Sequence, residues 1–351
     1  MIDLGDVEAL HAADPQDMLG AVAGLPGHCR SAYDAARALD LPKADGITAV
    51  TFCGMGGSAV AGDVLRGVFR DRLSVPVDVN RSPLLPAYAG PETLVVISSY
   101  SGNTSETLSA FREAVTRGCR LLAVSGGGTL VQEAGEAGAP MVPVPPGFQP
   151  RAALGHLGFA ALGALETMGL LPPLAGDVDE TVQELEALAL RMGPDAAPDR
   201  NPAKALAGLI GDRVPVIWGA EGIGAVAAMR WKTQMNENGK VPAFFSAMSE
   251  LDHNEVVGWT TPYGQRFSLV ALRHEGEHPE IAARFKLSYD IARAAGVEIE
   301  EVTAAGHSNL ARLMSLVLAG DFTSVYVGLR RGVDPTPVAV IDHLKASLAD
   351  A

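Results

Sequence analysis

The sequence has few of the residues that mark several large classes of protein. Its three cysteines, Cys29, Cys53 and Cys119, are widely spaced, which excludes a disulfide framework and a cysteine metal cluster and favours a reducing, cytoplasmic location. Positive charge is also scarce, since 27 Lys and Arg residues stand against 41 Asp and Glu residues. The resulting net charge of −14 argues against nucleic acid or an anionic membrane as a partner.

Long apolar runs are absent as well. No uninterrupted apolar stretch approaches the length that crosses a membrane, and the first residues lack the basic and apolar regions of a secretory leader. The chain does contain 48% hydrophobic and 19% charged residues, which is typical of a globular protein that can build full cores. Its length of 351 residues suits two domains of ordinary size, or one long domain.

Strands and helices are predicted to alternate through the first half of the chain. Residues 1–45 are predicted to be mainly helical, and residues 152–168 and 177–192 each show the pattern of a helix. The predicted strands between them are 48–53, 75–79, 93–98, 120–124 and 141–144. This rhythm predicts right-handed βαβ crossovers and a parallel sheet with helices on both faces.

The second half repeats this plan. Residues 214–224 match the strand–glycine–helix pattern of residues 48–58, but they lack its hydroxyl side chains. The remaining predicted strands are 267–272, 297–302 and 323–329. The predicted organisation is an N-terminal helical segment (1–45), a first domain (46–192), a linker (193–202), and a second domain with a C-terminal helix (203–351).

The most informative segment is the loop at residues 99–104, Ser-Tyr-Ser-Gly-Asn-Thr. It follows an apolar strand and leads directly into a predicted helix. Backbone N–H groups at a helix start, together with the hydroxyls of Ser99, Ser101 and Thr104, can bind an anion without a metal. The loop is therefore a candidate phosphate site.

Helix capping is the alternative for this loop, because Asn103 and Glu106 fit a capping box that needs no ligand. A second strand–glycine–helix element at residues 51–58 favours the anion instead. Gly57 lets the backbone approach a ligand closely, and Ser58 adds a hydroxyl at another helix start. The two loops together fit a phosphomonoester better than a dinucleotide, because the acidic residue typical of a dinucleotide site is only loosely represented.

One apparent metal motif is rejected. The segment from His274 to His278, His-Glu-Gly-Glu-His, matches a zinc motif that works only when a helix puts both histidines on one face. Gly276 interrupts the segment, and Pro279 disfavours helical backbone at His278. We therefore predict a polar loop before a helix that starts near Pro279, and no metal site.

Two charged residues are predicted at helix positions that are electrostatically unfavourable. Arg151 stands at the first turn of the helix over 152–168, where a cation opposes the helix dipole. Glu237 stands near the end of a helix over 225–236, where a carboxylate meets partial negative charge. Each side chain could simply be solvated. The functional alternative is an arginine that faces an anionic ligand and a glutamate that acts as a general base.

The C-terminal segment and one loop histidine leave alternatives open. Thr336 is predicted to cap the last helix, which Pro337 would start. Lys345 falls inside the apolar arc of that helix, so its ammonium either extends to solvent or enters a pocket. His253 has polar neighbours in a predicted loop, where a lone histidine is usually just solvated.

These residues lie in runs that resemble one family, the two-domain bifunctional phosphoglucose/phosphomannose isomerases of the SIS (sugar isomerase) fold. The matching runs follow one another along nearly the whole chain, and they are Gly54–Asp63, Ser98–Thr107, Pro145–Leu154, Arg230–Phe244, Glu250–Trp259, Ser308–Tyr326 and Gly332–Lys345. The resemblance implies an α/β fold of two tandem SIS-type three-layer αβα domains with mainly parallel sheets.

The resemblance also implies a reaction and a role for each residue. The reaction would interconvert glucose 6-phosphate, mannose 6-phosphate or both with fructose 6-phosphate through a cis-enediol(ate), without metal or cofactor, in glycolysis and gluconeogenesis. The implied phosphate ligands are Gly57, Ser58, Ser99, Ser101 and Thr104. The implied catalytic residues are Glu237 as the base at C2, Arg151 as the cation that stabilises the enediolate, and His253 and Lys345 for ring opening.

Further implications concern assembly and specificity. The family resemblance implies a homodimer in which His253 reaches the active site of the partner subunit. It also associates Thr336, in the run Asp-Pro-Thr-Pro, with the use of both sugar phosphates. Two other functions stay open: a non-catalytic phosphosugar-binding regulator, although residues 1–45 offer no basic recognition helix, and an SIS isomerase that acts on a different phosphosugar.

Overall fold

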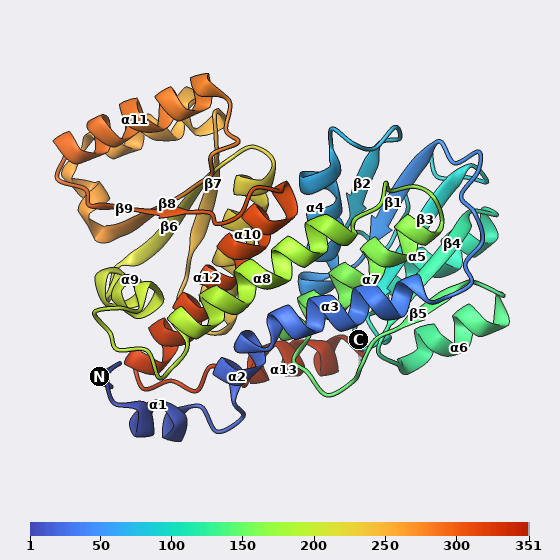
Figure 1. The fold of residues 1–351 in the computed structure, drawn as a ribbon, viewed down its shortest axis with the longest axis horizontal. Coiled ribbons are helices and arrows are strands. Elements are labelled where there is room, and N and C mark those ends of the chain that lie inside the picture. The colour runs from blue at the N-terminus through green and yellow to red at the C-terminus, as the bar shows by residue number, and fades with distance from the viewer. Residues whose placement is uncertain (350–351) are drawn as a thin grey trace.

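Two parallel β-sheets, one from each half of the chain, lie on either side of a shared layer of helices (Figure 1). The computed structural model describes residues 1–349. The first sheet lies toward the right of Figure 1 and the second toward the left, with long helices running between them. The predicted fold class, two αβα units with parallel sheets, is confirmed.

The first sheet has the strand order β2-β1-β3-β4-β5, and every neighbouring pair is parallel. Its strands are β1 (Ala49–Cys53), β2 (Val77–Asn80), β3 (Thr93–Ser99), β4 (Arg120–Ser125) and β5 (Met141–Pro143). Side chains alternate between its two faces, so Val96 packs toward the shared helices and Ile97 packs toward the outer ones. The outer helices are α5 (Ser105–Thr116) and α6 (Gly128–Glu136), and the inner ones are α4 (Gly56–Phe69) and α7 (Leu154–Thr167).

The second sheet repeats the centre of the first. Its order is β7-β6-β8-β9, so β6 pairs with β7 and β8 just as β1 pairs with β2 and β3. Its strands are β6 (Val214–Ala220), β7 (Phe244–Met248), β8 (Phe267–Arg273) and β9 (Ile299–Thr303). The helix α11 (Pro279–Ala294) and the short 3-10 helices η2 (Glu250–His253), η3 (Glu255–Thr260) and η4 (Pro262–Arg266) belong to its outer side.

The shared layer joins the two halves into one core. A single apolar cluster reaches from Val96 of the first sheet, through the helices, to Val270 of the second sheet. Besides α4 and α7, the layer contains α3 (Leu25–Arg37), α8 (Ala175–Met192), α10 (Ile223–Glu237) and α12 (Asn309–Arg330). By length and composition α12 could span a membrane, but 94% of its apolar window is buried inside the protein, as in a core helix.

The remaining helices lie near the ends of the chain and at the junction of the two halves. They are α1 (Val7–Ala13), α2 (Met18–Ala23), α9 (Pro202–Ile210) and α13 (Ala339–Ala349). Residues 193–201, which the sequence predicts as a linker, connect α8 to α9, and Asn201 caps α9 with its side chain. The domain boundaries drawn from the sequence stay a prediction.

One predicted strand is wrong and one observed strand is unpredicted. Residues 323–329 lie within α12, although β-branched and aromatic residues are frequent there. This helix is buried over most of its circumference, so neither a helical nor a strand period shows in its sequence. The unpredicted strand, β7, is a short edge strand whose first residue, Phe244, is exposed. The bounds of the other predicted strands differ from the observed bounds by at most two residues.

Candidate active site

The site begins at two helix starts that follow neighbouring strands. Helix α4 follows β1 and α5 follows β3, and β1 and β3 are paired in the first sheet. No side chain caps the N-terminus of either helix. Because the first backbone N–H groups of a helix have no acceptor within the helix, both termini offer donors to an anion.

The predicted phosphate-binding hydroxyls gather at these two helix starts. Ser58 Oγ accepts a hydrogen bond from the backbone N–H of Tyr100 at 3.2 Å, which joins the two loops. Ser99 Oγ lies 3.3 Å from Thr104 Oγ1, while Ser101 on the same loop is exposed. The structure therefore brings together all four hydroxyl residues that the sequence singles out.

The capping box suggested by the sequence is not formed. The N-cap residue of α5 is Thr104 rather than Asn103. The Asn103 Oδ1 instead accepts from the backbone N–H and the hydroxyl of Thr129, at 2.9 and 3.0 Å, and ties the loop to the start of α6. The capping interpretation of Asn103 and Glu106 is therefore wrong, and the N-terminus of α5 stays unblocked.

Gly57 brings these loops into contact with the segment that carries Arg151. A Cβ atom at Gly57 would lie 2.7 Å from the carbonyl oxygen of Pro150 and 3.3 Å from Arg151 Cα. Glycine is the residue that permits so close an approach of two backbones. The short 3-10 helix η1 (Pro150–Ala153) therefore lies directly against the start of α4.

Arg151 is buried, and most of its N–H donors are occupied. Its Nε donates to Asn238 Oδ1 at 2.6 Å, and its Nη2 donates to the carbonyl oxygens of Pro335 and Thr336 at 2.9 and 2.8 Å. Nη1 lies 3.4 Å from Glu237 Oε2. Burial lowers the pKa of this guanidinium, and the Glu237 charge opposes that shift. The interpretation of Arg151 as a solvated surface residue is wrong, and Nη1 is the end that remains for a ligand.

Glu237 is the last residue of α10, as predicted within one residue, and it faces Arg151. Its side chain is 29% exposed, so a ligand can reach it. The next residue, Asn238, is fully buried and donates from Nδ2 to Ser324 Oγ of α12 at 3.0 Å. Because Asn238 also accepts from Arg151, the helix end and the guanidinium are held in one fixed relation.

Thr336 does not cap the last helix. The first hydrogen bonds of α13 go to the carbonyl of Val338, two residues further along. The hydroxyl of Thr336 is buried and has no hydrogen-bond partner. Thr336 also lines a cavity of about 370 Å³ together with Phe148 and Gln149, next to Arg151. The capping prediction is therefore wrong, and a buried hydroxyl without a partner stands beside the candidate site.

The backbone of Arg151 also contacts a buried ion pair that is not predicted from the sequence. Arg230 on α10 and Asp321 on α12 are both buried and lie 2.8 Å apart. Arg230 Nη2 also donates to the backbone carbonyl of Arg151 at 2.6 Å. Burial raises the pKa of Asp321, and Arg230 opposes that shift. The available signal was a single acidic residue in the apolar run 313–329.

Two further predicted catalytic residues lie on other elements than Arg151 and Glu237. His253 ends η2 and is exposed, and Lys345 is exposed on α13. Within the described residues 1–349, neither side chain is an ion-pair or hydrogen-bond partner of the Glu237 carboxylate. The predicted roles of His253 and Lys345 therefore gain no geometric support from a single chain.

The apparent zinc motif lies in a loop, as predicted. Residues 274–278 connect β8 to α11, which begins at Pro279. His278 is the N-cap residue of α11, and its Nδ1 accepts from the backbone N–H of Glu280. His274 and His278 therefore do not share a helix face.

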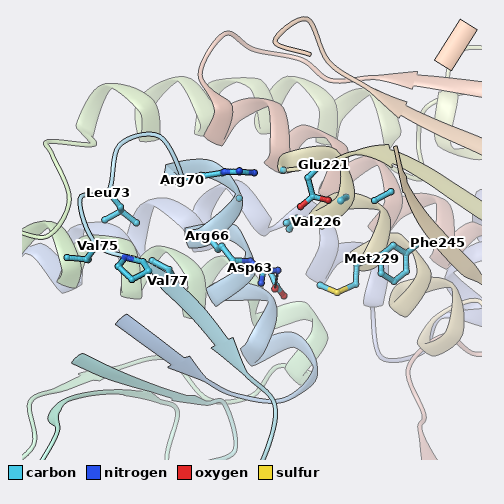
Figure 2. A pocket seen from close by; sticks show the side chains of 15 residues that line it. Asp63, Arg66, Arg70, Leu73, Val75, Val77, Glu221, Val226, Met229 and Phe245 are labelled. Carbon is cyan, nitrogen blue, oxygen red and sulfur yellow. Dashed lines mark hydrogen bonds and ion pairs between the residues drawn. The ribbon is translucent and has the colours of Figure 1, made fainter. Parts of the chain in front are cut away.

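A larger cavity lies at the opposite end of α10 (Figure 2). It has a volume of about 550 Å³ and is lined by Arg66 and Arg70 from the first half and by Glu221 and Phe245 from the second. Glu221 precedes α10, whereas Glu237 ends it, so the length of the helix separates this cavity from the site around Arg151. None of the predicted site residues lines the larger cavity.

Known proteins are similar to this chain in sequence and in fold. Residues 199–348 match the family model of the bacterial phosphoglucose isomerase C-terminal SIS domain. The chain is 38% identical to the bifunctional phosphoglucose/phosphomannose isomerase of Caldicellulosiruptor bescii, over 95% of this chain and 99% of that protein. It is 35% identical to the protein of the same name from Aquifex aeolicus, over 85% of this chain and 90% of that protein.

A solved structure has the same architecture. A glucose-6-phosphate isomerase-like protein from Thermus thermophilus superposes with a TM-score of 0.66 at 20% identity, covering 98% of this chain and 99% of that one. At this identity the likeness shows the fold alone. The sequence relatives carry the assignment, since the identity is high and extends over nearly the full length of both chains. The chain belongs to the family of bifunctional phosphoglucose/phosphomannose isomerases.

Proposed function

We propose that the protein is an aldose–ketose isomerase that interconverts glucose 6-phosphate and mannose 6-phosphate with fructose 6-phosphate, without a metal or cofactor. The observation that carries this proposal is the contact between Arg151 and Glu237 beside two uncapped helix starts. Enediol chemistry needs a positioned base, a fixed cation for the enediolate, and an anchor for the substrate. The names of the two sequence relatives agree with this activity.

The phosphate anchors the substrate at the starts of α4 and α5. The backbone at Gly57 and the free N–H groups of the two helix termini provide donors, and the four gathered hydroxyls add side-chain contacts. Because the phosphate does not react, its binding energy can be used to orient the sugar carbons against the catalytic groups.

Glu237 moves the proton in this mechanism. Its carboxylate removes the proton from C2 of the aldose, which gives a cis-enediol(ate), and then delivers a proton to C1. A proton also passes from O2 to O1, and the product is the ketose. Nη1 of Arg151 offsets the charge that develops on the enediolate oxygen. Since Nε and Nη2 are bound to Asn238, Pro335 and Thr336, the cation is fixed before the reaction and needs no reorganisation.

His253 assists ring opening from the partner subunit of a homodimer. Helix α10 has 15 residues at about 1.5 Å each, so its two ends lie about 22 Å apart. Glu237 is at one end, and Met248, which leads into η2, bonds to Glu221 at the other end. The chain therefore enters η2 at the end of α10 opposite Glu237, which supports a contribution of His253 from the partner subunit. The residue before it, Asp252, accepts from Ser288 Oγ at 2.6 Å.

Lys345 and Thr336 complete the proposed machinery. Lys345 assists ring opening from α13, whose apolar residues Ile341 and Leu344 are exposed in a single chain and would be covered in a dimer. Thr336 leaves the enediol enough room to take its proton on either face, which permits both epimers to react. The substrate is a soluble phosphosugar, and we place the enzyme in the cytoplasm.

Mixing two inactive variants tests the shared site. The Glu237→Gln chain lacks the base and the His253→Ala chain lacks the histidine, so a mixed dimer regains one intact site per pair. About a quarter of the wild-type activity is expected after random re-assortment of equal amounts, because half of the dimers are mixed and each has one of two sites. Mixing Glu237→Gln with itself is the control, and activity no higher than in this control would contradict sharing.

Removing two hydroxyls tests the phosphate site. Ser101→Ala combined with Thr104→Ala should raise KM for both sugar phosphates by about 10²-fold or more, because two hydrogen bonds to a charged group are lost and each is worth about 1.5–3 kcal/mol. The control is Ser31→Ala with Thr116→Ala, two exposed hydroxyls away from the site. An unchanged KM with a lower Tm would mean that Ser101 and Thr104 only stabilise the loop.

A coupled assay starting from fructose 6-phosphate decides between the candidate functions. Separate detection of glucose 6-phosphate and mannose 6-phosphate should show both products. A phosphosugar-binding regulator would bind fructose 6-phosphate and yield neither product. An isomerase of a different phosphosugar would also yield neither, and it would be identified by turnover of other hexose or pentose phosphates.

A further inference from the structure

Lys240 stands three residues after Glu237 in an unusual backbone conformation. Its φ of +53° lies in the left-handed region, which residues other than Gly, Asn and Asp rarely adopt. Residues held in this region concentrate at functional sites, where the surrounding contacts determine them. The side chain of Lys240 makes such contacts, and they connect two parts of the candidate site.

The ammonium of Lys240 joins the end of α10 to the segment around Thr336. It donates to the carbonyl oxygen of Glu237, and to those of Pro335 at 2.9 Å and Pro337 at 2.6 Å. A lysine ammonium has three N–H donors, so these three carbonyls use all of them. No donor is left for a substrate, which makes Lys240 a structural link within the site rather than a group that reacts.

The same segment is also bound by Arg151, which donates to the carbonyl oxygens of Pro335 and Thr336. Two cations therefore hold three consecutive carbonyls. The backbone N–H of Thr336 donates to Asp334 Oδ1 at 2.9 Å, and the proline ring of Pro337 restricts the backbone just after it. The hydroxyl of Thr336 is the one polar group of this residue without a partner, and its position is set by these bonds.

We propose that Lys240 is a positioning residue that sets the preference between the two sugar phosphate epimers by fixing Thr336 relative to the end of α10. The inference rests on the proposed function and on the specificity role of Thr336 within it. Arg151 donates to the carbonyl of Thr336 itself, whereas Lys240 links the carbonyls on either side of Thr336 to the backbone carbonyl of Glu237. Lys240 and Arg151 together therefore set the distance between the Glu237 carboxylate and Thr336, and of the two only Lys240 has no donor left for the substrate.

The physical reason is that the two epimers differ only at the carbon that Glu237 deprotonates. The part of the pocket near C2 and C3, which Thr336 would form, decides how easily the enediol presents each of its faces to Glu237. A displacement of about 1 Å near reacting atoms can change a rate by up to about 10²-fold. Loosening Thr336 should therefore change the two turnover rates unequally, while the phosphate loops, to which Lys240 makes no hydrogen bond, keep the affinity for both substrates.

The test compares Lys240→Met, Lys240→Arg and wild type with both substrates. Lys240→Met keeps the length of the side chain and removes the three donors, so the ratio of kcat for mannose 6-phosphate to kcat for glucose 6-phosphate should change by about fivefold or more, with KM changed by less than about threefold. Lys240→Arg, which keeps the charge and several donors, should restore most of the wild-type ratio. Thr336→Gln serves as the reference for a direct change of this part of the pocket, and Lys286→Met, an exposed lysine of α11, is the matched control.

Hydrogen–deuterium exchange of the peptide that contains residues 334–338 gives a second readout that does not depend on activity. Faster exchange there in Lys240→Met, but not in Lys286→Met, is expected. An unchanged ratio of kcat values in Lys240→Met, with or without a uniform loss of activity, would overturn the specificity role. Unchanged exchange would overturn the anchoring itself.

Failure of the proposed function is distinguishable from failure of this inference. If the wild-type protein isomerises neither sugar phosphate, the proposed function is wrong, and the exchange measurement still decides whether Lys240 anchors residues 334–338. If Lys240→Met does not fold, Lys240→Gln, which retains two N–H donors, is measured in the same way, and the same unchanged ratio would count against the proposal.

Discussion

Replacing Glu237 by glutamine should lower kcat by about 10³-fold, because a positioned general base contributes about 10²–10⁴-fold and no other carboxylate contacts the Arg151 guanidinium in the described residues 1–349. Glutamine has nearly the same shape and can still accept a hydrogen bond from Arg151 Nη1. The fold and the phosphate site should therefore be preserved, and KM should change by only about twofold. Steady-state kinetics with fructose 6-phosphate measures both quantities.

The control for this experiment is Glu186→Gln, an exposed glutamate on α8 that should retain wild-type kinetics. Circular dichroism and Tm should match wild type for both variants. A Glu237→Gln protein with wild-type kcat would remove Glu237 from the role of base. A large rise in KM without a fall in kcat would instead assign Glu237 to substrate binding.

Replacing Arg230 by methionine should cost about 3–5 kcal/mol of unfolding free energy, because it leaves the Asp321 carboxylate buried without its partner. The exposed fractions of the two side chains are only 1% and 6%, so water cannot compensate. Arg230 also donates to the backbone of Arg151, and its loss should reduce kcat as well. Urea unfolding monitored by circular dichroism and by activity measures both effects.

Two further variants separate burial from simple loss of charge. The double variant Arg230→Met with Asp321→Leu removes both charges and should recover much of the lost stability, since the unpaired carboxylate is gone. The matched surface pair is Arg30 with Asp179, for which Arg30→Met should cost less than about 1 kcal/mol. Equal losses from Arg230→Met and Arg30→Met would contradict the importance of burial.

The sequence was sufficient to predict the parts of the site that lie at element boundaries. The hydroxyl loop at 99–104 follows a strongly apolar strand, so its position at the edge of the sheet could be inferred. Glu237 was correctly expected at a helix end, since Asn238 and Gly239 follow it. Local patterns of this kind depend on short stretches of chain, so they are visible in the sequence.

Contacts between distant segments could not be predicted in the same way. The choice between a solvated and a functional Arg151 could not be made from the sequence, because its partners, Asn238 and the carbonyls of residues 335–336, are far along the chain. The helix α12 looked partly like a strand because burial on nearly all sides removes the polar positions that reveal a period. The Arg230–Asp321 pair depends on that helix, so it was missed for the same reason.

The layer of helices between the two sheets has a consequence for motion during turnover. One continuous apolar cluster belongs to both halves, so separating them would expose that cluster to water at a high cost in free energy. Hinge closure of one lobe over the substrate, which many two-lobed enzymes use, is thus not available to this chain. The mutual geometry of Arg151 from one half and Glu237 from the other is therefore set when the protein folds.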